Sequence, residues 1–174
     1  MKTLIVGPEP SQALHVRQVP DSALLTGGRP LFLRDEVDKV ELTVMPAVRV
    51  SRLGLCVSLR FAPRYYDALT LVALNCDREW SEESLVADNA LIVGQWLPVP
   101  QGPAAVASPD GAVAKWPDLR PAFDEAVSAV SRRSTLKTGD IIVLAQPCGR
   151  YEARLGSLPR WSLDGSPALG FKIR

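Results

Sequence analysis

The chain contains one histidine, His15, and only three cysteines. The cysteines are odd in number and far apart in sequence, and none is part of a CxxC pair, which favours buried free thiols over a disulfide framework or a zinc site. A lone histidine with no acid or nucleophile nearby gives little support for a catalytic role. The lack of a disulfide pattern indicates a reducing compartment, and we expect a cytoplasmic protein.

Long apolar runs and long charged runs are also missing. No run approaches the ~18 apolar residues that a membrane span requires, and the short apolar start of the chain is broken at once by Gly7 and Pro8, unlike a signal sequence. The 20 Lys and Arg nearly balance the 19 Asp and Glu, and no basic run is longer than a pair. Neither a membrane nor nucleic acid is therefore expected as a partner.

What the chain does have is enough length for one sizeable core. A chain of 174 residues can bury roughly 70% of the surface that its unfolded form exposes. The sequence shows no internal repeat, low-complexity segment or convincing domain boundary. We therefore expect a single domain spanning residues 1–174.

Strand-like segments dominate, with two helices between them. Residues 42–50 are apolar and partly β-branched, and Pro46 within them indicates a bulge or an edge position. Residues 68–76 are apolar on both faces, which is typical of a central, covered strand. A short helix is predicted at about 58–66 and the main helix at about 119–133, where apolar residues recur at helical spacing. The predicted fold class is α+β, mostly β.

Two charged groups near these elements each allow two interpretations. Asp77, Arg78 and Glu79 directly follow the second strand, and they form either a ligand site or a solvated strand end. Arg60 and Arg64 are one helical turn apart and could clamp an anionic ligand, or they could simply lie on a solvated helix face.

Five segments together carry a family resemblance. They are AVRVSRLG at 47–54, RFAPRYYD at 60–67, ADNA at 87–90, PDG at 109–111 and TLKTGDII at 135–142. The last is the most specific. By their order and spacing from about Pro30 to the C-terminus, the chain resembles a short member of the fumarylacetoacetate hydrolase family.

This resemblance implies a rolled, mixed β-sheet fold that is commonly dimeric. It also implies a Mg²⁺ or Mn²⁺ ion held by carboxylates at the open end of the sheets. Members with an intact site hydrolyse carbon–carbon bonds in acylpyruvates, or decarboxylate and isomerise related keto acids. The cation binds the keto and carboxylate oxygens and stabilises the enolate that develops.

The family's metal ligands are not matched by carboxylates here. Its Glu-x-Glu pair falls on Thr43 and Met45, and a slipped register offers Lys39 and Glu41 instead. Its aspartate ligand falls on Leu74. A hard cation needs several oxygen donors, so the resemblance implies a degenerate site without a bound metal.

Four more residues fall at family positions around the site, and two of them, Leu85 and Gln146, differ from the family pattern. The four are Arg78 in the A-R-D segment, Leu85 at the family's lysine, Asp88 in the FDG-like segment and Gln146 at the T-G-T-P strand end. These four residues are the remaining candidates for lining a pocket.

Two main functions are consistent with these residues. The first is a homodimeric relative that has lost the metal-dependent activity, needs no cofactor and acts as a binding or structural protein. The second is a Mg²⁺- or Mn²⁺-dependent hydrolase, lyase or decarboxylase for an acylpyruvate-like keto acid, with a rebuilt site drawing on Glu41, Asp77 and Glu79, and with Asp88 as a further candidate. A third, an unrelated β-domain that binds a protein, requires an exposed patch formed by Trp80, Trp96 or Trp161.

Overall fold

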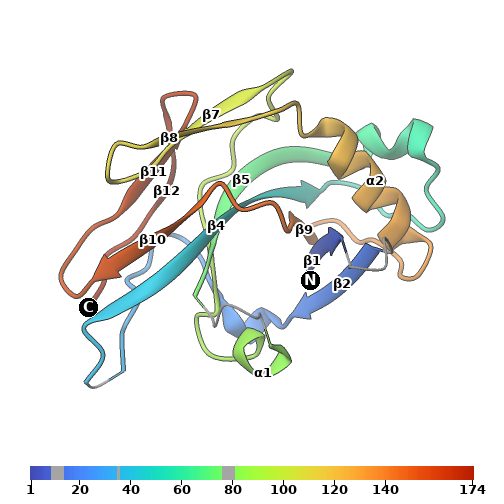
Figure 1. The fold of residues 1–174 in the computed structure, drawn as a ribbon. Coiled ribbons are helices and arrows are strands. Elements are labelled where there is room, and N and C mark those ends of the chain that lie inside the picture. The colour runs from blue at the N-terminus through green and yellow to red at the C-terminus, as the bar shows by residue number, and fades with distance from the viewer. Residues whose placement is uncertain (9–13, 35, 76–80) are drawn as a thin grey trace.

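The computed structural model describes residues 1–8, 14–34, 36–75 and 81–174, and it arranges them into two sheets (Figure 1). The larger sheet has the strand order β2-β1-β9-β4-β5-β6-β3, with β10 also paired to β4. Its strands are β1 (Thr3–Pro8), β2 (Leu14–Val19), β3 (Leu24–Leu25), β4 (Lys39–Val50), β5 (Tyr66–Leu74), β6 (Leu91–Val93), β9 (Ile141–Leu144) and β10 (Gly149–Arg154). The smaller sheet, of order β12-β11-β7-β8, consists of β7 (Ala104–Ala107), β8 (Val113–Trp116), β11 (Arg160–Leu163) and β12 (Ser166–Gly170).

The large sheet is mixed, as expected. β1 pairs with β9 and β3 with β6 in parallel, whereas β4 pairs antiparallel with β5, β9 and β10. The helices are η1 (Asp21–Ala23), η2 (Leu59–Arg64), α1 (Glu82–Leu85) and α2 (Arg120–Ser131). The predicted α+β, mostly β fold class is confirmed.

Strands β4 and β5 run through the middle of the molecule (Figure 1). They pair from Thr43 opposite Leu74 to Val50 opposite Tyr66, with an irregularity near Arg49. β5 lies between β4 and β6, and its residues from 68 to 74 are all buried. The prediction of a central strand in this region is therefore confirmed.

Pro46 lies inside β4, at a place where one partner strand gives way to another. Along one edge, β4 pairs with β10 up to Val44 and with β9 from Ala47 onward. Val44 O accepts from Cys148 N at 2.9 Å and Val50 N donates to Asp140 O at 2.8 Å, so even-numbered residues direct their backbone groups to this edge. Pro46 lacks an amide hydrogen, and its nitrogen meets the gap between the two ladders. β4 is thus a central strand, and the edge position expected for Pro46 is limited to this gap in its pairing.

Both helices predicted from the sequence are present. The main helix, expected at about 119–133, is α2 at 120–131, and its Phe123, Val127 and Val130 are buried at helical spacing. The short helix, expected at about 58–66, is the 3₁₀ helix η2, which contains Pro63. Proline cannot donate an i to i−4 hydrogen bond, which limits this segment to a short, tight turn of helix.

The large sheet has apolar side chains on both faces. Even-numbered residues of β4, such as Leu42 and Val48, belong to a core shared with α2 and the smaller sheet. Odd-numbered residues, such as Met45 and Ala47, belong to a second core. Residues 19–25 and α1 contribute Val19, Leu24 and Leu85 to this second core.

Two close contacts join distant parts of the chain. Gly94 N donates to Leu71 O at 3.0 Å, and Gln95 N donates to Ala168 O at 2.7 Å, which brings β12 against the segment that follows β6. At the start of the chain, Lys2 forms an ion pair with Asp140, a carboxylate that is 1% exposed. Asp140 Oδ1 also accepts from Lys2 N at 2.9 Å, and Oδ2 accepts from Lys137 N at 2.8 Å.

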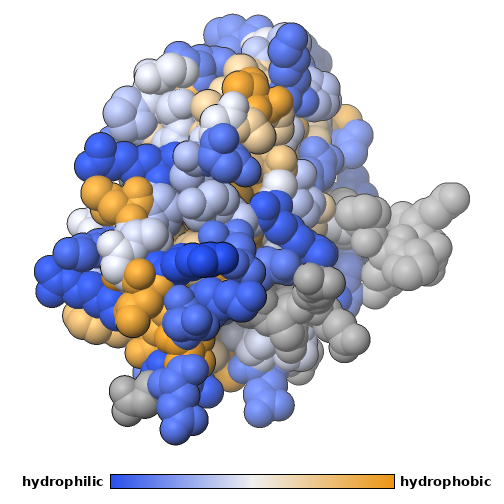
Figure 2. Space-filling model, turned by 60° about the vertical axis from the view of Figure 1, so that its left-hand side comes forward, coloured by the Kyte–Doolittle hydropathy of each residue, from blue (hydrophilic) through white to orange (hydrophobic). Residues whose placement is uncertain are grey.

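The surface on the side of β10 and β11 is mixed in character. In Figure 2, apolar residues there form small orange groups between hydrophilic residues drawn in blue. Within the part of the chain that is described, no helix combines the length and apolar character needed to cross a membrane.

Candidate functional site

The three positions at which the family resemblance places metal ligands lie together on one face of the large sheet. Thr43 on β4 is directly opposite Leu74 on β5, and Met45 follows two residues along the same side of β4. Their exposed fractions are 7% for Thr43, 0% for Met45 and 1% for Leu74. The fold therefore brings these side chains together, although the sequence separates β4 from β5.

Apolar side chains surround these three positions. Met45 and Leu74 belong to one buried cluster with Leu85 of α1, the residue at the family's lysine position. Helix α1 begins after Ser81, whose Oγ accepts from Ser84 N at 3.2 Å, and the cap helps to place Leu85 on this face. The rest of the cluster consists of Ile5, Val19, Ala23, Leu24, Ala47, Val72, Ala90, Leu91, Val93, Ile141 and Val143.

A hard divalent cation does not fit this face. Mg²⁺ and Mn²⁺ take carboxylate, carbonyl and water oxygens, whereas a methionine sulfur and a leucine methyl supply none. Thr43 is the one side chain of the three with an oxygen, and a neutral hydroxyl does not offset the charge of the ion. In the described ranges, no group of three or more His, Cys, Asp or Glu residues is placed to hold a metal.

The other predicted site residues are exposed or lie outside the described ranges. Glu41 is exposed, two residues before Thr43 on the same side of β4, and its Oε1 is 3.8 Å from Arg150 Nη1. Asp88 and Gln146 are exposed, one in the turn after α1 and the other between β9 and β10. The predictions for Arg78, Asp77 and Glu79 fall on residues 76–80, which are not among those described.

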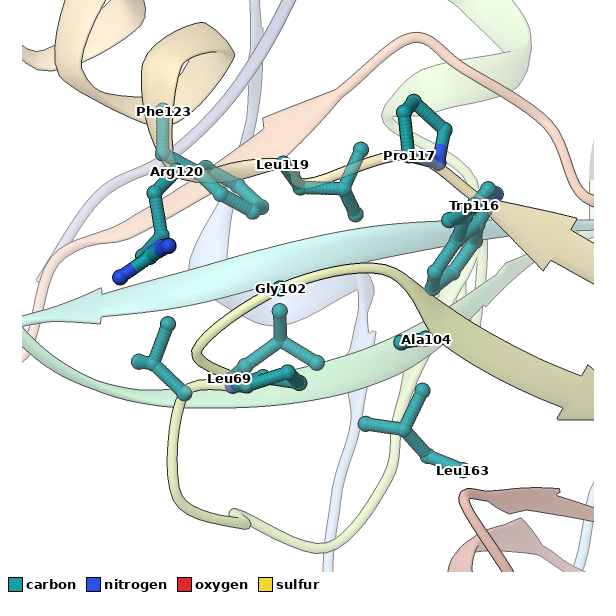
Figure 3. Close-up of a pocket in the computed structure, with 11 residues that line it drawn as sticks. Leu69, Gly102, Ala104, Trp116, Pro117, Leu119, Arg120, Phe123 and Leu163 are labelled. Atoms are coloured by element: carbon teal, nitrogen blue, oxygen red, sulfur yellow. The ribbon is translucent and has the colours of Figure 1, made fainter.

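A small apolar pocket lies where the start of α2 meets β5 and β8 (Figure 3). Leu69, Trp116 and Phe123 contribute to its wall, and its volume is about 10 Å³, which is room for about one water molecule. Arg120 lies at its mouth, where its Nε donates to Asp118 Oδ1 at 2.9 Å and its Nη1 to Gln101 Oε1 at 2.8 Å. The pocket is too small for a keto acid.

A second pocket, of about 100 Å³, lies between β8 and β10. Cys148 lines it together with Tyr151 and Trp161, whose rings are 5.4 Å apart in an edge-to-face arrangement. Burial raises the pKa of the Cys148 thiol to about 11. The thiol is therefore protonated at neutral pH and is a poor nucleophile.

A third and much larger cleft, of about 920 Å³, lies at the edge of the large sheet and has a basic lining. Arg29, Arg49, Arg160 and Lys172 contribute to it. Arg49 is already paired with Asp67, through Nη2 to Oδ2 at 3.0 Å, and its guanidinium lies 5.5 Å from the centre of the Trp96 ring. This cleft could not be predicted from the sequence, because its basic residues come from four separate parts of the chain and match no local motif.

Of the tryptophans named for the third interpretation, the two that the structure describes, Trp96 and Trp161, do not form an exposed patch. Trp161 is buried between Tyr151 and Phe171, and Trp96 is half-buried beside Arg49. Trp80 lies outside the described residues.

Comparison with known proteins gives no match by sequence and a clear match by fold. No family model matches the chain, and no curated protein matches it. Among solved structures, fumarylpyruvate hydrolase from Pseudomonas aeruginosa in complex with Mn²⁺ and pyruvate superposes with a TM-score of 0.75 at 14% identity, over 99% of this chain and 89% of that chain.

Two further structures agree. The 2-hydroxyhepta-2,4-diene-1,7-dioate isomerase from Mycobacterium marinum has a TM-score of 0.78 at 19% identity, over 99% of this chain and 73% of that one. A protein from Yersinia pestis CO92, described as of the fumarylacetoacetate hydrolase family, has a TM-score of 0.76 at 16% identity, over 99% and 93% of the two chains. At such low identity the similarity concerns the fold. The chain has the fold of the fumarylacetoacetate hydrolase family.

Proposed function

We propose that this chain keeps the fumarylacetoacetate hydrolase fold without the family's carboxylate metal site, and acts as a binding or structural protein. The observation that supports the proposal is the chemistry of the face formed by Thr43, Met45 and Leu74. Met45 and Leu74 pack into an apolar cluster, and the buried Thr43 beside them supplies the single hydroxyl of the three. A divalent cation placed there would lose its hydration shell without gaining the oxygen ligands that replace it.

A metal-dependent enzyme with a rebuilt site is the second candidate. The fumarylpyruvate hydrolase of similar fold is described with Mn²⁺ and pyruvate, which makes a keto acid the reasonable substrate class. Glu41 favours this candidate, because it projects from the same side of β4 as Thr43 and is exposed. Asp77 and Glu79 follow β5, the partner of β4, and would have to converge with Glu41 on one cation.

Calorimetric titration separates the two candidates. The purified protein is treated with a chelator and titrated with Mg²⁺ and with Mn²⁺, each with and without oxalate as a keto-acid analogue. We expect no saturable heat from the natural chain. Saturable binding that disappears in Glu41→Ala or Asp77→Ala, and persists in the control Glu125→Ala on α2, would refute the proposal and support the enzyme.

A restored site tests whether Thr43, Met45 and Leu74 are the positions that matter. We expect the triple variant Thr43→Glu, Met45→Glu and Leu74→Asp to be strongly destabilised without metal, because three carboxylates are buried together. Mn²⁺ at 100 times its Kd would then return about 2.7 kcal/mol, seen as a rise in Tm or as recovery of the folded circular dichroism spectrum. A variant that gains nothing from Mn²⁺ would show that these positions do not correspond to the ligands.

A further inference from the structure

The loop between β4 and η2, together with η2 itself, exposes four large apolar side chains within nine residues. Leu53 is 70% exposed, Leu55 61%, Leu59 51% and Phe61 43%. Solvent-exposed apolar residues scattered singly are ordinary, whereas a local group of this kind marks an interaction surface. Exposed basic residues lie in the same segment and at the end of α2 and just beyond it, and we call this surface the basic apolar patch. It consists of Leu53, Leu55, Leu59 and Phe61 with Arg52, Arg60, Arg64, Arg132, Arg133 and Lys137.

Two distant parts of the chain build this patch. Gly54 and Leu136 exchange backbone hydrogen bonds of 3.0 and 2.7 Å, and Cys56 N donates to Ser131 O at 2.9 Å. These bonds place the loop beside the segment that follows α2, which carries the last three basic residues of the patch. In the sequence the same six cations are spread over more than eighty positions. Their gathering at one end of the molecule is a property of the fold.

Acidic residues are missing from both segments. Residues 51–66 and 126–139 contain no Asp or Glu. The acids just beyond them are engaged elsewhere: Asp67 pairs with Arg49, Asp124 accepts from Tyr66 Oη at 2.9 Å, and Asp140 pairs with Lys2. Glu125 is exposed on α2, two helical turns before Arg132. The patch is therefore strongly positive, although the chain as a whole is nearly neutral.

Two of the arginines lie beside the aromatic ring of the patch. The guanidinium carbon of Arg64 is 5.2 Å from the centre of the Phe61 ring, and that of Arg60 is 5.6 Å from it. Cation–π contact at such distances is attractive, and it holds charged and apolar groups together at one point of the surface. The sequence was consistent with either a site for an anionic ligand or a solvated helix face at Arg60 and Arg64. The exposed apolar side chains beside them indicate an amphipathic surface instead.

The charge and shape of the patch restrict what can bind there. The three pockets described above do not include its apolar side chains. A second copy of the chain, related by a two-fold axis, would bring six cations against six cations. The phosphates of a nucleic acid would match the cations but would leave the leucines facing a charged backbone.

An anionic lipid surface matches both parts of the patch at once. Leucine and phenylalanine side chains can enter the boundary between head groups and acyl chains, while arginines around them contact lipid phosphates and carboxylates. We propose that the basic apolar patch docks this protein on a membrane surface rich in anionic lipid. The expectation of no membrane partner rested on the lack of a spanning run, and contact with one leaflet requires no such run. This inference does not depend on whether the protein binds a metal.

Vesicle sedimentation tests the proposal. The full chain is mixed with vesicles of phosphatidylcholine alone, or of phosphatidylcholine with about one-third phosphatidylserine, at low and at high salt. We expect binding to the second vesicle, weakened by salt. Each cation contributes roughly fivefold to the partition coefficient, so Arg60→Gln with Arg64→Gln should weaken binding roughly 25-fold.

The apolar side chains have a separate variant and a matched control. Leu53→Ser with Leu55→Ser should weaken binding at least tenfold, because both side chains leave water on docking. Arg154→Gln with Leu155→Ser removes an exposed cation and an exposed leucine at the β10 end of the molecule, and should leave binding unchanged. All of these residues are exposed, and circular dichroism checks that the variants fold.

Three results would overturn the proposal. One is equal binding to neutral and anionic vesicles, and another is an unchanged affinity in either patch variant. The third is no binding to either vesicle, which would leave an acidic protein as the partner to seek. A fluorophore on Cys56, which is exposed within the patch, gives a second readout, because docking should shift its emission to the blue and bring it within reach of brominated lipid tails.

Discussion

The buried ion pair between Lys2 and Asp140 gives a sharp test of what holds the first strand in place. Asp140 is 1% exposed and Lys2 is 18% exposed, and the carboxylate also accepts backbone hydrogen bonds from Lys2 and Lys137. Removing one partner of a buried pair costs about 3–5 kcal/mol. Since Lys2 retains some contact with water, we expect Asp140→Asn to lower the free energy of unfolding by about 3 kcal/mol. For a chain of this size, that corresponds to a fall in Tm of about 6–12 °C.

The pH dependence of this effect has a definite sign. Burial acts to raise the pKa of the Asp140 carboxyl, but the hydrogen bonds from Lys2 and Lys137 outweigh it and lower that pKa. A lowered pKa in the folded state stabilises the protein above the pKa of the unfolded aspartate, about 4, and this stabilisation is lost as the pH falls toward the folded value. The difference between the natural chain and the variant should therefore be full at pH 7 and shrink progressively below pH 4.

Thermal unfolding followed by circular dichroism at pH 7 and at pH 3 measures both quantities. The matched control is Glu152→Gln, which removes an ion pair of 2.9 Å to Lys39 whose side chains are 47% and 57% exposed. Exposed pairs contribute about 1 kcal/mol or less. If the two variants shift Tm equally, burial is not what makes the Lys2 pair important. An Asp140→Asn difference that is undiminished at pH 3 would contradict the lowered pKa of Asp140.

Three further predictions concern packing, thiol chemistry and assembly. A Cβ atom on Gly94 would lie 2.1 Å from Ala168 O, whereas one on Gly102 would meet nothing within 4 Å. In urea titrations, Gly94→Ala should therefore lower the free energy of unfolding by about 3 kcal/mol or more, and Gly102→Ala should lower it by less than about 0.5 kcal/mol. At pH 8, iodoacetamide should label the exposed Cys56 much faster than Cys148, as read by peptide mass spectrometry, because burial raises the Cys148 pKa to about 11; equal rates would contradict this. Among the described strands, β10 pairs with β4 alone, and its other edge is available for the homodimer that the family resemblance implies. Light scattering should therefore give twice the monomer mass, and a monomer at high concentration would refute the predicted homodimer.

Local sequence patterns were enough to predict the main elements of this fold. The spacing of Phe123, Val127 and Val130 predicted α2, and the two-sided apolar character of residues 68–76 predicted the central strand β5. Each of these signals is contained within one element. The role of Pro46 was predicted only in part. The gap that accommodates it lies between the partner strands β10 and β9, and the sequence of β4 alone does not reveal that gap.

The surroundings of the candidate site depend on pairing between distant segments, and the sequence could not supply them. The resemblance identified Thr43, Met45 and Leu74 separately, but their meeting on one face follows from the register of β4 and β5. The charge balance and the short basic runs likewise indicated that nucleic acid is not a partner, and they gave no sign of a basic surface. Backbone hydrogen bonds between residues 54–56 and 131–136 bring together the segments that carry Arg60 and Arg132. This arrangement cannot be predicted from the composition of the chain.

The parallel pairing of β1 with β9 also bears on how this protein is made. Thr3 pairs with Ile141, across 138 positions of the chain, so this ladder closes a very long loop and is expected to form late and slowly. While the chain is still being synthesised, β1 has no partner on that edge until β9 has left the ribosome. An unpaired apolar strand edge is a template for pairing with other chains. The time of greatest aggregation risk is therefore before residue 144 emerges, and slowing translation before that point should lower the soluble yield.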